Sequence, residues 1–376
     1  MPREVVITGL GVVTPLDCGK GIDIFWKGLC SGTNVIKPIK SFNTDGHKCN
    51  VGGEIPGFVT DDRCAKIFSL ACEQAVADSG IAFRSEIMGI SFGSILAGIG
   101  SKGKDYFSNY ASTVVAERWN LRGPNICLNT ACSSGADAVG LAFNEILIGR
   151  VDVMIAGAAD LFSEFAFQGF SALDALTKDG LVRPFDKNRT GLALSEGAGA
   201  LILEEKAHAR KRSAKIYAEL KGFASGSDAY HLVRPHPEGE GLSMVISQAI
   251  ANAGINLNEV DFINAHGTGT TYNDAMETKA IKRAFGKFAS AIKITSIKSM
   301  IGHALGASSV IEIISSIKAM ESNTIPPTIN YQTPDPECGL DYVFNQACKK
   351  DIRSSLCLSA GFGGQNSAIL LTKEEQ

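Results

Sequence analysis

The chain has 376 residues, 45% of them hydrophobic, which is enough for a large buried core in one domain or in two halves. Lysine and arginine total 36 against 39 aspartate and glutamate residues, which excludes a global basic field for nucleic acid or an anionic membrane. The ten cysteines have no regular spacing and no C-x-x-C pair, which argues against a disulfide framework or a zinc site and suits a reducing compartment.

We expect no targeting signal at the N-terminus. Residues 1–7 lack the apolar length and the small-residue cleavage site of a signal peptide. No stretch approaches the roughly 20 uncharged apolar residues that a membrane-spanning helix needs. We therefore expect a soluble, cytoplasmic protein with no membrane span and no nucleic-acid partner.

Short β-rich runs alternate with longer helical runs in the first part of the chain, which predicts an α/β fold. The run 151–158 is apolar on both faces, as expected of a central strand that helices cover on both sides. The expected elements are a strand over 5–9, a helix over 63–77, a strand over 87–93, a helix after Cys132, and strands over 151–158 and 201–205.

A similar order starts again near Ala214. The expected elements here are a strand over 215–223, a helix over 242–253, a strand over 260–265, helices over 274–285 and 305–320, and a strand, glycine-rich turn and strand over 356–371. We therefore expect two related halves, residues 1–212 and 213–376. They should share one continuous core, because no low-complexity linker separates them.

Cys132 stands among small residues in Asn-Thr-Ala-Cys-Ser-Ser-Gly, directly before an amphipathic helix. At a helix N-terminus, unpaired backbone N–H groups and the helix dipole favour a thiolate, so we expect the pKa of Cys132 to fall and its reactivity to rise. The alternative is a small buried cysteine with a structural role, which is the commoner case for an unselected cysteine. The small neighbours of Cys132 favour a nucleophile.

Two of the six histidines have unusual surroundings. His266 follows a predicted strand, within Asn-Ala-His-Gly-Thr-Gly-Thr, and catalytic groups of α/β folds gather at the carboxyl ends of strands. His303 lies between glycines at the expected opening of a helix. The other four histidines are interpreted as surface or satisfied core residues, namely His47, His208, His231 and His236.

One cysteine nucleophile and two imidazoles form a specific chemical set. The sulfur can take an acyl group from a thioester, and two neutral imidazoles can donate hydrogen bonds to a second thioester oxygen as an enolate forms. A histidine beside a helix N-terminus tends to stay neutral, which suits a hydrogen-bond donor.

Five sequence blocks, in a fixed order over most of the chain, carry a family resemblance. They are Thr-Ala-Cys-Ser-Ser-Gly at 130–135, Arg-Pro-Phe-Asp at 183–186, Asn-Ala-His-Gly-Thr-Gly-Thr at 264–270, Lys-Ser-Met-Ile-Gly-His at 298–303 and Gly-Phe-Gly-Gly-Gln-Asn at 361–366. With these blocks the chain resembles the β-ketoacyl-[acyl carrier protein] synthases of the thiolase superfamily, most of all the elongating, type II branch of KAS I/II-like ketosynthases. The resemblance implies a thiolase-like fold, in which two pseudo-repeated halves form an αβαβα layered core.

The resemblance also implies roles for the reacting groups. Cys132 would be the acylated nucleophile, while His266 and His303 would promote decarboxylation of malonyl-carrier protein and stabilise the enolate. The backbone N–H groups of Cys132 and Phe362 would form an oxyanion hole. Lys298 would support the histidine pair.

Further residues match supporting positions of the family. Glu312 matches the acidic partner of Lys298, and without the family the two would be interpreted as solvent-exposed charges. Thr268 and Thr270 match residues that hydrogen-bond the phosphopantetheine arm, although turn chemistry alone would explain both. Phe362 resembles a gate to the acyl pocket and Phe170 a wall of that pocket; in isolation these two would be ordinary core residues.

The expected activity is a decarboxylating Claisen condensation that extends an acyl-carrier-protein thioester. No metal and no resident cofactor is expected, because the phosphopantetheine arm arrives on the carrier protein. The expected partners are acyl- and malonyl-loaded carrier proteins and a second subunit, in a homodimer or in a heterodimer with a related chain. An alternative is a subunit of such a heterodimer with a shaping or decarboxylating role in a specialised pathway.

Several features separate the chain from other enzyme classes and from its housekeeping relatives. A degradative thiolase needs a second cysteine near the C-terminal glycine-rich turn, and 361–367 has none. The segment 93–122 looks shorter than in housekeeping elongating synthases, and Gln365 and Ser367 differ from the commonest fatty-acid pattern, which suggests a polyketide or polyene pathway. The G-x-G-x-x-G match at 98–103 is not interpreted as a dinucleotide site, because no acidic residue follows a clear strand about 20 positions on.

Overall fold

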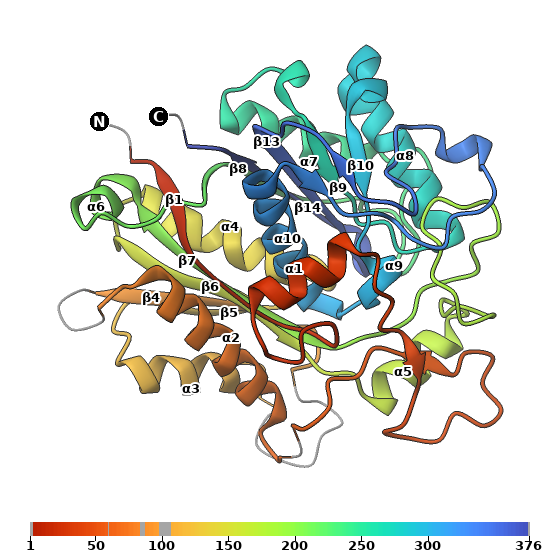
Figure 1. The fold of residues 1–376 in the computed structure, drawn as a ribbon, viewed down its shortest axis with the longest axis horizontal. Coiled ribbons are helices and arrows are strands. Elements are labelled where there is room, and N and C mark those ends of the chain that lie inside the picture. The colour runs from red at the N-terminus through yellow and green to blue at the C-terminus, as the bar shows by residue number, and fades with distance from the viewer. Residues whose placement is uncertain (1–2, 59, 83–86, 98–106, 375–376) are drawn as a thin grey trace.

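The computed structural model describes residues 3–58, 60–82, 87–97 and 107–374, and a mixed β-sheet runs through its centre (Figure 1). The G-x-G-x-x-G match at 98–103 lies outside the described residues. The strands of this sheet are, from edge to edge, β10 (Lys293–Thr295), β9 (Phe262–Asn264), β13 (Ser354–Ala360), β14 (Gln365–Thr372), β8 (Ala218–Ser227), β1 (Val5–Val13), β7 (Gly197–Glu205), β6 (Val153–Asp160), β4 (Met88–Gly93) and β5 (Asn125–Leu128). Two strand pairs lie outside it, β2 (Lys37–Pro38) with β3 (Val51–Gly52) and β11 (Thr324–Ile325) with β12 (Cys348–Lys349).

The sheet consists of two sets of five strands with the same pattern. From β1 outward, β7 and β6 are antiparallel additions, and β4 and β5 continue parallel to β6. From β8 outward, β14 and β13 are antiparallel additions, and β9 and β10 continue parallel to β13. β1 pairs with β8, so the two sets form one continuous sheet.

Helices divide this sheet into layers. α2 (Arg63–Ser79) and α3 (Tyr110–Trp119) share a core cluster with the first strand set, and α7 (Glu240–Ala253) and α8 (Thr271–Phe285) share one with the second. α4 (Ser134–Leu147) and α10 (Ser308–Ser322) lie between the two sets and contact strands of both (Figure 1). The result is five layers in the order αβαβα. The remaining α-helices are α1 (Ile22–Cys30), α5 (Glu164–Ala172), α6 (Lys206–Lys211) and α9 (Lys298–Ile301).

Small residues allow the two central helices to approach closely. At Gly135 of α4, a Cβ atom would come within 2.7 Å of the Gly306 oxygen, of Ser309 Oγ and of a methyl group of Val310. Any side chain here would therefore push α4 away from α10. The distance between α4 and α10 also affects the distance between Cys132, which precedes α4, and His303, which precedes α10.

The α/β fold and its layered core are confirmed. The expected strands and helices are present, and several have different bounds. The strand predicted over 151–158 is β6 (Val153–Asp160), and the strand predicted over 215–223 is β8 (Ala218–Ser227). The helix predicted from residue 305 begins at Ser308, after a 3-10 turn over Leu305–Ala307. The boundary at residues 212 and 213 falls between α6 and β8, and remains a prediction. In the described part of the chain, no helix combines the length and the apolar character needed to cross a membrane.

Candidate active site

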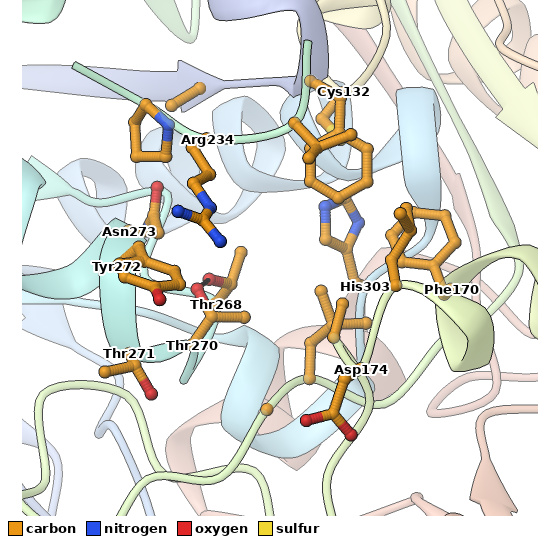
Figure 2. Close-up of a pocket in the computed structure, with 18 of the residues that line it drawn as sticks. Cys132, Phe170, Asp174, Arg234, Thr268, Thr270, Thr271, Tyr272, Asn273 and His303 are labelled. Atoms are coloured by element: carbon orange, nitrogen blue, oxygen red, sulfur yellow. Dashed lines mark hydrogen bonds between the residues drawn. The ribbon is translucent and has the colours of Figure 1, made fainter. Parts of the chain in front are cut away.

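Cys132, His266 and His303 come together at the ends of elements from both halves of the sheet. Figure 2 shows Cys132 and His303 at the same end of the pocket. All three are buried, and one nitrogen or sulfur atom of each lies within 4.8 Å of those of the other two. The two imidazole rings meet edge to face, with centroids 5.4 Å apart and an interplanar angle of 81°. The residues that sequence spacing singled out therefore form one cluster.

A tight turn holds Cys132 between β5 and α4. Ala131 has a positive φ of 51°, which is costly for a residue with a side chain, and its carbonyl oxygen accepts the Ser134 N–H at 3.0 Å. Ser134 Oγ accepts the Thr130 N–H at 2.9 Å, which closes the turn from the other side. α4 begins at Ser134, two residues after the cysteine.

The expected fall in the pKa of Cys132 is wrong in direction. Burial raises the pKa of the thiol to about 11, although the charge of Lys298 and hydrogen bonds from the backbone N–H groups of Phe362 and Cys132 act to lower it. The sequence showed the helix N-terminus but not how far the pocket excludes water from the sulfur. The resting side chain is therefore a thiol at neutral pH.

The backbone N–H groups of Phe362 and Cys132 both lie at the Cys132 sulfur. They are the two groups that the resemblance implied for an oxyanion hole. Gly361 leads into this corner, and a Cβ atom there would lie 3.0 Å from the Cys132 nitrogen and 3.1 Å from the Ala131 Cβ. Only a residue without a side chain leaves this space open. Ser133 Oγ donates to the backbone carbonyl oxygen of Gln365 at 3.2 Å, which connects the turn of Cys132 to the start of β14.

His266 is oriented from behind by a buried lysine. Lys298 Nζ lies 2.7 Å from the His266 carbonyl oxygen and 3.4 Å from His266 Nδ1, and it also bonds to the Glu312 carboxylate. The ammonium group donates only, so His266 Nδ1 is an acceptor and the ring proton sits on Nε2. Lys298 and Glu312 are both 1% exposed, so they lie behind the histidine and are not solvent-exposed charges.

His303 is held in the same tautomer by a different donor. The Leu305 N–H donates to His303 Nδ1 at 3.0 Å, and the Ser308 hydroxyl lies 3.1 Å from the same nitrogen. The proton of this ring therefore also sits on Nε2. Leu305 reaches this position with a positive φ of 53°, a strained conformation for a leucine.

Both imidazoles are neutral. Burial, followed by the charge of Lys298, lowers the pKa of His266 and of His303 well below the usual value. The expectation of neutral histidines is thus confirmed, with burial as the main cause in place of a helix dipole. Two neutral rings with Nε2–H groups can donate to one oxygen atom and cannot act as strong acids.

Two buried carboxylates hold the loops of the site, and the sequence analysis did not identify them. Glu277 of α8 accepts the backbone N–H groups of His266 at 2.6 Å and Gly267 at 2.8 Å. Asp160, at the end of β6, accepts the Gly306 N–H at 2.8 Å and the Leu96 N–H at 3.0 Å. Burial raises the pKa of Glu277 to about 7 and that of Asp160 to about 6. An acidic residue at the end of an apolar strand was the available signal for Asp160.

The three reactive residues open into a cavity of about 550 Å³ that reaches the surface. Thr268 and Thr270 line it with their hydroxyl oxygens 2.9 Å apart, while Phe170 and Phe362 stack with ring centroids 5.4 Å apart and an interplanar angle of 24°. The site residues proposed from the sequence therefore lie in this cavity, except Lys298 and Glu312, which lie behind it.

The Cys132, His266 and His303 donor set has the element types of a zinc site, but its surroundings do not suit a cation. The buried ammonium group of Lys298 lies 3.4 Å from His266 Nδ1, so a divalent ion would meet a positive charge. Both Nε2 atoms also carry protons that a metal would have to displace. The arrangement fits hydrogen-bond donation to an oxyanion better.

Comparison with known proteins assigns the two parts of the chain to one family. The model for the N-terminal domain of β-ketoacyl synthases matches residues 2–209, and the model for the C-terminal domain matches 217–332. The 3-oxoacyl-[acyl-carrier-protein] synthase 2 of Coxiella burnetii is 37% identical over 410 aligned residues, which cover 99% of this chain and 99% of that protein. The alignment is longer than this chain, so the relative has residues without a counterpart here.

Specialised synthases are equally similar. A putative polyketide β-ketoacyl synthase 1 of Streptomyces cyaneus is 37% identical over 99% of this chain and 98% of its own length. A type II polyketide ketosynthase, solved in complex with its acyl carrier protein, has a TM-score of 0.92 and 33% identity over the full length of both chains. The ishigamide ketosynthase/chain length factor has the same TM-score and 32% identity, also over both full lengths. The chain therefore belongs to the β-ketoacyl synthase family and has its thiolase-like ketosynthase fold.

Proposed function

We propose that the protein is a 3-oxoacyl-[acyl carrier protein] synthase, which joins an acyl group held on Cys132 to the carbon released by decarboxylation of a malonyl thioester. One observation carries the proposal: a buried cysteine and two neutral imidazoles with inward Nε2–H groups meet within 4.8 Å. Family membership supports the same reaction class.

Acyl transfer is the first step. Cys132 Sγ forms a bond to the carbonyl carbon of the acyl thioester, and the thiol proton leaves with the departing carrier thiol. The carbonyl oxygen gains negative charge between the backbone N–H groups of Cys132 and Phe362, which stabilise it by preorganised hydrogen bonds. Stabilisation at this point matters because the thiol has a raised pKa.

Decarboxylation supplies the carbon nucleophile. The bond between the malonyl carboxylate and its methylene carbon breaks, carbon dioxide leaves, and the electron pair forms an enolate whose oxygen accepts from His266 and His303. The enolate carbon attacks the acyl carbonyl on Cys132 and expels the sulfur, which regains a proton from solvent. No strong base is needed, so neutral histidines suffice.

The substrates and partners follow from the cavity and the relatives. A cavity that leads from the surface to a buried nucleophile suits a thioester on a long flexible arm, so acyl- and malonyl-loaded carrier proteins are the proposed partners. No resident cofactor or metal takes part in this proposal. Cys132, His266 and His303 act on the substrate, Lys298 and Glu312 position His266, Thr268 and Thr270 bind the arm, and Phe170 and Phe362 bound the acyl pocket.

The pathway and the assembly form a second level of the proposal. Gln365 and Ser367 in the last block favour a specialised polyketide or polyene pathway, while equal identity to a 3-oxoacyl-[acyl-carrier-protein] synthase 2 and to a polyketide β-ketoacyl synthase is compatible with either kind of pathway. Ten free cysteines suit the cytoplasm. We propose a homodimer; a heterodimer in which this chain only shapes the site or decarboxylates is the alternative, which the intact nucleophile disfavours.

Intact-protein mass spectrometry tests the proposal. The purified chain, incubated with acyl-carrier protein, should gain one acyl mass on Cys132, and addition of malonyl-carrier protein should yield a 3-oxoacyl product. The control variant Cys348→Ser, at a cysteine outside the cavity, should behave like the natural chain. Absence of any acyl adduct, with both substrates intact, would contradict the proposal and favour the alternative subunit role.

The variant Cys132→Gln separates the two half-reactions. It removes the nucleophile but leaves His266 and His303, so condensation should be lost while carbon dioxide release from malonyl-carrier protein continues. Loss of both activities in a folded variant would show that the histidines do not stabilise the enolate on their own.

A further inference from the structure

An arginine at the mouth of the cavity has no role in the chemistry above. Arg234 lines the cavity and is exposed. Its guanidinium lies over the ring of Tyr272, 5.3 Å from the centroid, and Figure 2 shows it pointing from the rim toward that ring. The aromatic contact restricts the side chain to the mouth without neutralising it.

The charge of Arg234 is not offset within the cavity. The lining contains two permanent cations, Lys178 and Arg234, and one carboxylate, Asp174. Lys178 Nζ lies 2.7 Å from one oxygen of Asp174, and Lys48, which is not a lining residue, lies 3.2 Å from the other. Asp174 is therefore satisfied without Arg234 and offsets the charge of Lys178 in the lining. Arg234 belongs to none of the ion pairs found among the described residues. The mouth therefore carries one net positive charge.

The wall next to Arg234 adds weaker attraction for an anion. α8 begins beside Arg234, and its first residues, Thr271, Tyr272 and Asn273, line the cavity. Thr270, the residue before the helix, makes no side-chain hydrogen bond to cap it. The positive end of this helix thus faces the same space. Deeper in, the threonine hydroxyls give way to the stacked phenylalanines and to Cys132, all of which are uncharged.

We propose that Arg234 binds the phosphate group of the phosphopantetheine arm and so selects thioesters that carry a phosphate at a fixed distance from the sulfur. The inference rests on the proposed function. The gradient from a cationic mouth to an uncharged interior matches an arm with a phosphate at one end and a thioester at the other. Arginine suits the role because its planar fork bonds two phosphate oxygens at once.

Carrier-free thioesters test this directly. The probes are acyl-phosphopantetheine, acyl-pantetheine without the phosphate, and the short acyl-N-acetylcysteamine, and the measurement is the rate of Cys132 acylation against thioester concentration. The natural chain should need about tenfold less acyl-phosphopantetheine than acyl-pantetheine for half-maximal acylation, a typical effect of one charge-assisted hydrogen bond. Arg234→Ala should lose this difference, and Arg234→Lys should keep part of it.

The controls separate failure of this inference from failure of the proposed function. Arg353→Ala, at an exposed arginine outside the cavity, should keep the difference, and acylation by N-acetylcysteamine thioester should be unchanged in Arg234→Ala. No acylation by any probe would contradict the proposed function itself. Acylation of the natural chain with equal preference for both pantetheine probes would overturn only the arginine assignment.

A final experiment uses the loaded carrier protein. The loss in Arg234→Ala should be about the same with the carrier-borne arm as with the free arm. A loss that appears only with the carrier protein would show that Arg234 contacts the carrier protein itself and not the phosphate of the arm, and would also overturn the assignment. The tenfold preference should shrink at high salt, because the charge lies near solvent.

Discussion

The two imidazoles of the site carry their protons on the same nitrogen for two different reasons. A buried ammonium group, Lys298, lies at His266 Nδ1, and a backbone N–H group, that of Leu305, donates to His303 Nδ1. Each of these contacts at Nδ1 leaves the Nε2–H group free to donate, and burial keeps both rings neutral. Lys298 and the Leu305 N–H group, which are unrelated, therefore give both histidines an Nε2–H donor in the same cavity.

The ionisation of Cys132 gives the first prediction at this scale. Because the pKa of the thiol is raised to about 11, the thiolate fraction should grow about tenfold for each unit of pH from 7 to 10. The rate of Cys132 alkylation by iodoacetamide, followed by mass spectrometry of its peptide, should rise in the same proportion. Circular dichroism at each pH checks that the protein stays folded.

A flat rate above pH 7 would contradict this prediction. It would mean that the N-terminus of α4 outweighs burial, as the sequence alone suggested. The variant Cys132→Ala identifies the signal, since the other nine cysteines remain in it.

At the residue scale, sequence patterns identified the reacting groups but not their environment. Cys132, His266 and His303 stand in distinctive blocks of small residues, so they could be found from the chain. The carboxylates Asp160 and Glu277 were missed. Asp160 had a weak signal, an acidic residue at the end of an apolar strand, whereas Glu277 had none, because its role is to accept hydrogen bonds from the backbone N–H groups of His266 and Gly267. The direction of the pKa shift of Cys132 depends on burial, which a local sequence pattern does not show.

At the scale of elements, the contact between α4 and α10 sets the distance between the nucleophile and His303. Substitution of Gly135 by alanine would place a Cβ atom 2.7 Å from three atoms of the facing segment. We expect the free energy of unfolding to fall by about 1–3 kcal/mol, the usual cost of overpacking. Urea unfolding measures the change, and Cys132 acylation should slow in the same variant.

Gly169 provides the matched control. It also lies inside a helix, α5, but a Cβ atom there would meet no atom within 4 Å. Gly169→Ala should leave stability unchanged or raise it by up to about 1 kcal/mol, because alanine favours the helix. Equal effects at the two glycines would show that the α4 and α10 contact is looser than described.

Most long elements were predicted and most short ones were missed. Strands such as β6 and helices such as α2 have enough apolar residues to show their period. β5, with four residues, and β10, with three, were missed, as was the ten-residue helix α3, whereas the three-residue strand β9 lies within the strand predicted over 260–265. The positions of β5 and β10 are decided by pairing with β4 and β9, which is a tertiary effect.

At the scale of the whole molecule, the two halves depend on each other for burial. α10 belongs to the second half of the chain, yet it packs against β7 and β1 of the first. β1 also pairs with β8 through Val5, Val6 and Ile7. α4 of the first half likewise contacts β14 and β8 of the second, so each central helix covers strands of both sets.

The chain should therefore unfold in one transition. Both tryptophans, Trp26 and Trp119, lie in the first half, so tryptophan fluorescence reports that half, whereas far-ultraviolet circular dichroism reports the whole chain. We expect the two urea curves to coincide, as in a single cooperative unit. A fluorescence midpoint clearly separate from the dichroism midpoint would show that the halves unfold independently.

The raised pKa of Cys132 has a consequence for selectivity among chemical reagents. Oxidants and simple electrophiles react with thiolates, so a buried thiol that stays protonated near neutral pH is poorly reactive toward peroxide and general alkylating agents. Activation instead requires a carbonyl oxygen placed between the N–H groups of Cys132 and Phe362. A covalent inhibitor of this protein should accordingly owe its potency to a carbonyl group delivered through the cavity, and a more reactive warhead without that group should gain little.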